Sequence, residues 1–103
     1  MYHTTSRDGI TEINPTDEHL KELLLSVGEE EGDESAPDVW LTHLETGWCI
    51  SVFPGGYVTL ENNLRPVPER EMEELSNQRI FSLWKLLAAG DIENLMDQPW
   101  SKK

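Results

Sequence analysis

The stretch that decides the fold reads DVWLTHLETGWCISVFPGGYVTLEN and runs from Asp38 to Asn62. β-Branched and aromatic residues alternate there with polar ones, and two turn signals interrupt the alternation. Thr46-Gly47 suits a two-residue hairpin turn, and Pro54-Gly55-Gly56 suits a three-residue turn whose glycines supply a positive φ. The stretch therefore predicts a three-stranded antiparallel meander.

Side chains alternate across a strand, so this pairing gives the meander two faces. The predicted core face carries Val39, Leu41, His43, Trp48, Ile50, Val52, Val58 and Leu60. The opposite face carries Trp40, Thr42, Leu44, Cys49, Ser51, Phe53, Tyr57 and Thr59. That second face is too aromatic for a simple solvated surface and too polar for a second full core. We expect part of it to be covered by a helix of this chain, by a second copy in a homodimer, or by another molecule.

The segment before the meander predicts one short strand and one helix. Residues 1–8 are polar and are expected to fray, whereas residues 9–13 alternate briefly and could add a strand at the sheet edge. Asn14 is placed to cap a helix that has Pro15 at its first position. The expected apolar stripe of this helix consists of Leu20, Leu23, Leu24 and Val27, and Gly28 is expected to end the helix.

The segment after the meander predicts a longer helix. Its apolar stripe consists of Met72, Leu75, Ile80, Leu83, Trp84 and Leu87, with a weak spot at residues 76–78. Gly90 stands where a C-cap glycine would, Asp91 could cap a short last turn, and Pro99-Trp100 closes the domain before a frayed tail at 101–103. The predicted order is β-α-β-β-β-α, a single α+β domain over 1–103 with a small antiparallel sheet and helices packed on one face.

Charge is the strongest property of the whole chain. Twenty Asp and Glu against eight Lys and Arg give a formal net charge of -12 and a sequence pI near 4.4. Such a field repels nucleic acid and anionic membranes and attracts cationic surfaces, so a basic protein is the natural partner. The sequence also has no secretory leader, no apolar run of membrane length and one cysteine, which together favour a cytoplasmic protein without disulfides.

Many of the acids lie in one segment, residues 28–38, which has no basic residue and little to bury. We expect a loop, because burial cannot offset the entropy lost on ordering it. It is either a solvated linker or an acidic arm that meets a basic partner. In the second case the contact residues would be Glu29, Glu30, Glu31, Asp33 and Glu34.

The sequence gives little support for catalysis. The three histidines are far apart, so neither a metal site nor a cofactor is predicted. On the two-residue turn, Cys49 lies opposite Leu44 and on the other face from His43, which leaves the thiol without a base. The glycine pair of the second turn lacks the helix that follows a phosphate-binding loop. We therefore expect a binding protein, not an enzyme.

Several short motifs lie between the start of the meander and the C-terminus: VWLT from Val39, TGW from Thr46, ISV from Ile50, GYVTL from Gly56, FSLWKLLAAG from Phe81, and Pro99-Trp100. Together they resemble the first-numbered family of immunity proteins from bacterial polymorphic-toxin systems. The resemblance spans roughly residues 38–100. It implies a small cytoplasmic protein that binds one secreted toxin domain, often a nuclease or deaminase, and blocks it in the producing cell.

The resemblance identifies no binding residues in this chain, so the candidate contacts are chosen from their charge and exposure. Cationic toxin surfaces would be met by the acids of residues 28–38, and exposed aromatics such as Trp40, Phe53 and Tyr57 would supply desolvated anchors. Two other functions stay open. The chain could be an acidic secretion chaperone that holds an unfolded effector segment, or a nucleic-acid mimic that inhibits a DNA- or RNA-binding protein.

Overall fold

A computed structural model of the chain describes residues 2–6, 11–26, 39–53 and 56–102. The predicted acidic segment 28–38 therefore lies outside the described residues. The elements along the chain are β1 (Tyr2–Ser6), β2 (Thr11–Ile13), α1 (Asp17–Ser26), β3 (Val39–His43), β4 (Trp48–Phe53), β5 (Tyr57–Asn62), β6 (Arg70–Met72), α2 (Asn77–Ala88), α3 (Ile92–Met96) and β7 (Ser101–Lys102).

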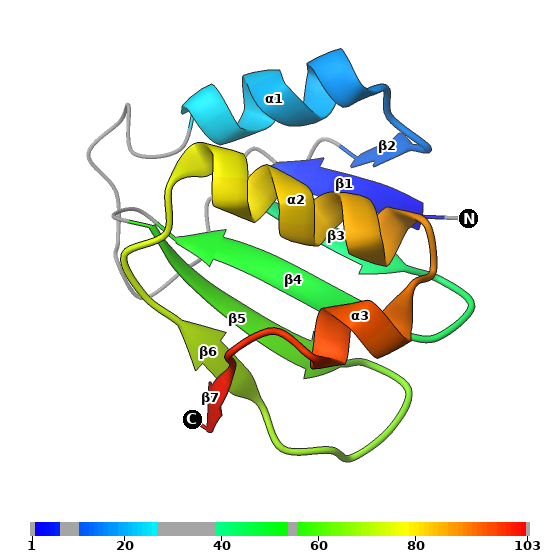
Figure 1. Ribbon diagram of the computed structural model, residues 1–103. Coiled ribbons are helices and arrows are strands. Elements are labelled where there is room, and N and C mark those ends of the chain that lie inside the picture. The colour runs from blue at the N-terminus through cyan, green and yellow to red at the C-terminus, as the bar shows by residue number, and fades with distance from the viewer. Residues whose placement is uncertain (1, 7–10, 27–38, 54–55, 103) are drawn as a thin grey trace.

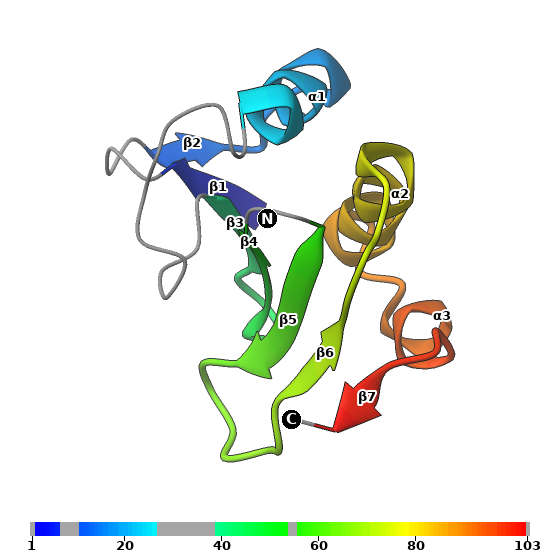
Figure 2. The same ribbon diagram turned by 90° about the vertical axis from the view of Figure 1, so that its left-hand side faces the viewer.

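The strands form one seven-stranded sheet in the order β2-β1-β3-β4-β5-β6-β7, and all neighbouring pairs are antiparallel. All three helices lie on the same side of this sheet, with α2 crossing its middle (Figures 1 and 2). The predicted α+β class and the packing of helices on one face are confirmed. The meander β3-β4-β5 forms the centre of the sheet, so its outward side chains define the middle of the face without helices.

The register of the meander differs from the prediction at one turn. The second turn is confirmed, since Phe53 pairs with Tyr57. The predicted two-residue turn at Thr46-Gly47 is wrong. Cys49 pairs with Thr42, and residues 44–47 form a longer connection. Local bonds select this connection: the Gly47 amide donates to the carbonyl oxygen of His43 at 2.8 Å, and Gly47 has a φ of +78°. The pairing has shifted by two residues, which leaves every side chain on its predicted face.

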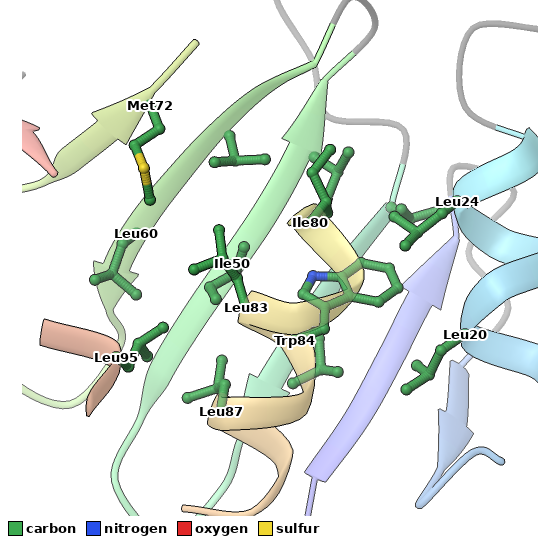
Figure 3. Packing of buried hydrophobic residues seen from close by; sticks show 14 residues of the cluster. Leu20, Leu24, Ile50, Leu60, Met72, Ile80, Leu83, Trp84, Leu87 and Leu95 are labelled. Atoms are coloured by element: carbon green, nitrogen blue, oxygen red, sulfur yellow. The ribbon is translucent and has the colours of Figure 1, made fainter. Parts of the chain in front are cut away.

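The core lies between the central strands and the helices (Figure 3). Trp84 of α2 is its largest fully buried side chain, and α3 contributes Leu95. The fully buried strand residues include Val39, Leu41, Ile50, Val52, Val58 and Leu60, as alternation predicts. Trp48 and Trp100 pack against this cluster and remain partly exposed. Three of the four tryptophans therefore lie on the face of the sheet that the helices cover.

The N-terminal segment is more ordered than predicted. Tyr2–Ser6 is not frayed but pairs with both β2 and β3, and the predicted edge strand is confirmed as Thr11–Ile13. Asn14 is not the N-cap of α1; its side chain accepts a hydrogen bond from the Tyr2 amide at 3.1 Å. Thr16 caps the helix instead, through a bond from the His19 amide to its hydroxyl. Leu20 and Leu24 are buried as predicted, and Val27 and Gly28 lie outside the described residues.

The C-terminal segment begins as strand, not as helix. Arg70–Met72 pairs with β5, and the helix starts only at Asn77, where the sequence predicts a weak spot. The end of α2 is as predicted: Gly90 has a φ of +73°, and the amides of Gly90 and Asp91 bind the carbonyl oxygens of Leu87 and Leu86. Asp91 caps α3. The expected frayed tail is wrong for Ser101–Lys102, which pairs with β6.

Ser76 provides a test of where α2 begins. Its hydroxyl accepts a hydrogen bond from the Arg79 amide at 3.2 Å, as an N-cap does. Ser76→Ala should lower the free energy of unfolding by about 1 kcal/mol. In a helix that continued through residue 76, alanine would instead stabilise the protein. Urea unfolding of the two proteins, followed by far-UV circular dichroism, distinguishes these outcomes by sign.

Candidate binding surface

The sheet face opposite the helices, called here the outer face, carries aromatic, hydroxyl and carboxylate groups. Register partners form one row across all seven strands: Thr11, Thr5, Trp40, Ser51, Thr59, Glu71 and Ser101. A second row runs through Ile13, His3, Thr42, Cys49 and Glu61. The short side chains at the centre of both rows are buried, whereas Trp40 and Glu61 are half-buried.

Three aromatic side chains of this face come from the meander. Trp40 and Tyr57 are half-buried, and so is Phe53. The rings of Phe53 and Tyr57 are cross-strand neighbours with centroids 5.1 Å apart at a tilt of 45°. The Tyr57 hydroxyl donates a hydrogen bond to the Glu71 carboxylate, which fixes the outer end of the ring. Large rings with restrained positions are suited to anchor a protein partner, because little side-chain entropy is lost on binding.

A hollow of about 270 Å³ opens on the same face. It is lined by Trp40 of β3, Cys49 and Ser51 of β4, Glu61 of β5, and Asn63 just beyond β5. The hollow exists because β4 places short side chains between an indole on one neighbouring strand and a carboxylate on the other.

The charge of the outer face is negative. Glu61 and Glu71 project from β5 and β6, and neither of the two rows contains a Lys or Arg among the residues that the structure describes. Cations are found on the helix side, where Lys85 binds Asp17 at 2.7 Å and Lys21 lies 5.2 Å from the centroid of the Phe81 ring. The outer face can thus accept cations from a partner but offers few to an anion.

The thiol of Cys49 is held in its neutral form. Burial raises the pKa of Cys49, and the negative charge of Glu61 acts in the same direction. His43 cannot act as its base, since His43 lies on the core face and its Nδ1 is 2.8 Å from the Thr46 hydroxyl. Within the described ranges, no three His, Cys, Asp or Glu side chains are grouped so that they could hold a metal ion.

Alkylation measures this burial directly. We expect iodoacetamide to modify native Cys49 at least about tenfold more slowly than the urea-unfolded chain at the same pH, since the buried thiol is mostly protonated. The raised pKa also makes stability depend on pH. Above the pKa of an unfolded thiol, the unfolded chain loses the proton that the folded protein retains, so the free energy of unfolding falls as pH rises. Equal rates in the two states would show that the thiol is open to solvent.

The structure brings together the three predicted aromatic anchors Trp40, Phe53 and Tyr57 on one face. The five predicted acidic contacts, Glu29, Glu30, Glu31, Asp33 and Glu34, lie outside the described residues. Sequence reasoning missed Glu61 and Asn63, although continued alternation from Thr59 would have placed both on this face. It also missed Glu71, because residues around it were interpreted as helix.

Comparison with known proteins gives no further constraint. No protein-family model, curated protein or solved structure matches this chain. No helix in the described part of the chain is long and apolar enough to span a membrane. The geometry and charge of the outer face are therefore the features that bear on function.

Proposed function

We propose that this chain is an immunity-type protein that binds a secreted toxin domain with a basic surface and neutralises it by forming a one-to-one complex. The observation that carries this proposal is the outer face, where half-buried aromatic rings stand beside the Glu61 and Glu71 carboxylates. The protein would act in the cytoplasm of the cell that makes the toxin.

The aromatic rings would supply most of the binding free energy. Interfaces depend on a few anchors, among which tryptophan and tyrosine are enriched, and these anchors lie near the centre of the contact. Trp40, Phe53 and Tyr57 sit on the central strands, so a partner seated on the meander would bury all three. Beside Trp40, the short side chains of Cys49 and Ser51 line a hollow into which a partner's side chain can fit.

The negative charge would supply speed and selectivity. A net charge of -12 steers a cationic partner toward the protein and repels acidic ones. Toxins that act on nucleic acid need cations around their clefts to hold phosphates. An acidic inhibitor can form charge-assisted hydrogen bonds with those same Lys and Arg side chains.

Capture from the native cell lysate tests the proposal. The tagged chain is used as bait, washed at rising salt concentration, and the retained proteins are identified by mass spectrometry. We expect a folded basic domain in one-to-one ratio whose retention weakens as salt rises. That domain should be toxic when expressed alone and harmless when co-expressed with this chain. Retention of an unfolded effector segment would indicate a chaperone, and retention of a nucleic-acid-binding host protein would indicate a mimic.

A further inference from the structure

The hollow of the outer face has opposite walls of different chemistry. Cys49 and Ser51 form its floor on β4, Trp40 stands on the β3 side, and Glu61 stands on the β5 side. Since neighbouring strands are about 4.8 Å apart, the two walls rise from backbones separated by roughly 10 Å. A flat group placed between them would have an aromatic ring on one side and a carboxylate on the other.

The electrostatic conditions favour a cation in this hollow. In the ranges that the structure describes, no residue forms an ion pair with the Glu61 carboxylate or donates a hydrogen bond to it. The floor adds no competing charge, because burial raises the pKa of the Cys49 thiol and keeps it neutral. Asn63 and Ser51 add oxygen atoms that can accept further N–H bonds.

We propose that this hollow receives an arginine side chain of the partner, with the guanidinium lying against the Trp40 indole and donating hydrogen bonds to the Glu61 carboxylate. Arginine fits better than lysine for two reasons. Its guanidinium is planar and stacks on an aromatic face, and its paired N–H groups match the two oxygens of a carboxylate. A lysine ammonium is a strongly hydrated point charge that gains less from the indole.

This proposal rests on the proposed function in one respect, namely that the arginine belongs to the toxin domain. The pocket itself can be tested without the partner. The probe is N-acetyl-arginine amide, which carries the guanidinium without a carboxylate. N-acetyl-citrulline amide is the neutral match of nearly the same shape, and N-acetyl-lysine amide is the other cation. Binding is followed by the NMR signal of the Trp40 indole N–H, assigned with Trp40→Phe.

We expect the arginine probe to shift this signal saturably at millimolar concentration, and the other two probes to bind at least about tenfold more weakly. Glu61→Gln should weaken the arginine probe by about tenfold or more, since it removes the charge-assisted bonds. Glu93→Gln is the matched control, because it removes the same charge from the exposed surface of α3 and should leave binding unchanged.

Three results would overturn the arginine pocket: no saturable shift, equal binding of the citrulline or lysine probe, or equal weakening by both glutamine variants. Failure of the pocket and failure of the proposed function are distinguishable. A captured basic domain without probe binding rejects the pocket alone, whereas probe binding without any captured domain rejects the function alone.

Discussion

Trp84→Ala should lower the free energy of unfolding by about 3–5 kcal/mol, the range for removing a large aromatic side chain from a packed core. Trp84 is fully buried between α2 and the central strands, among Leu20, Ile50 and Leu83 (Figure 3). Small domains have a total stability of about 5–15 kcal/mol, so this one change would remove much of it. It would also leave a cavity that helices fixed by their other contacts cannot fully close.

Trp84→Phe is the matched control. Among the residues that the structure describes, none accepts a hydrogen bond from the buried indole N–H of Trp84, so the ring contributes through its apolar contacts. Phenylalanine removes this polar group, which costs free energy when buried. Trp84→Phe should therefore cost much less than Trp84→Ala. Urea unfolding followed by far-UV circular dichroism measures both. Equal losses for the two variants, or a loss below about 1 kcal/mol for alanine, would contradict the assigned packing.

Trp40→Ala should weaken binding of the captured partner by about 2 kcal/mol or more, which is roughly a 30-fold rise in Kd. Trp40 is the largest side chain of the outer face, and it forms one wall of the hollow. Truncation removes a ring that a partner would desolvate. Because Trp40 is only half-buried, the free energy of unfolding should change less than for Trp84→Ala.

Leu25→Ala is the control for this prediction. Leu25 is a large apolar residue that is 64% exposed, and it lies on α1, on the helix side of the molecule. Isothermal titration calorimetry should give an unchanged Kd for Leu25→Ala. If Leu25→Ala weakened binding and Trp40→Ala did not, the partner would sit on the helices and the outer face would not be the site.

The meander shows why faces can be predicted from sequence more easily than pairing. Alternation of period two assigns each side chain to one face, and it correctly separates Val39 and Leu41 from Trp40. A shift of two residues leaves that pattern intact, so alternation cannot tell whether Thr42 or Leu44 faces Cys49. Which of the two residues pairs with Cys49 depends on the hydrogen bonds within the turn, and the residue types alone do not reveal these bonds.

The missed strands are too short or too polar to show a pattern. Arg70–Met72 has three residues inside an acid-rich run, and such a run also fits the surface of a helix. Tyr2–Ser6 is mostly polar, although it is an interior strand of the sheet and its Thr4 is buried. Both become strands because neighbouring strands provide hydrogen-bond partners, a tertiary effect that outweighs local preference.

The candidate site was predictable only in part for the same reason. Trp40, Phe53 and Tyr57 all belong to the meander, so local alternation was enough to group them. The Glu71 carboxylate reaches Tyr57 only because β6 pairs with β5. The wall formed by Glu61 depends on how far β5 extends past the second turn. Contacts between segments far apart in the chain had to come from the structure.

Fluorine NMR of the chain labelled with 5-fluorotryptophan tests the central claim most directly. The four tryptophans report on different places: Trp40 on the outer face, Trp84 in the core, and Trp48 and Trp100 at its edge on the helix side. Addition of the captured partner should shift the Trp40 signal and remove its solvent isotope effect, while the Trp84 signal stays in place. A Trp40 signal that does not change while that of Trp48 or Trp100 moves would contradict binding at the outer face.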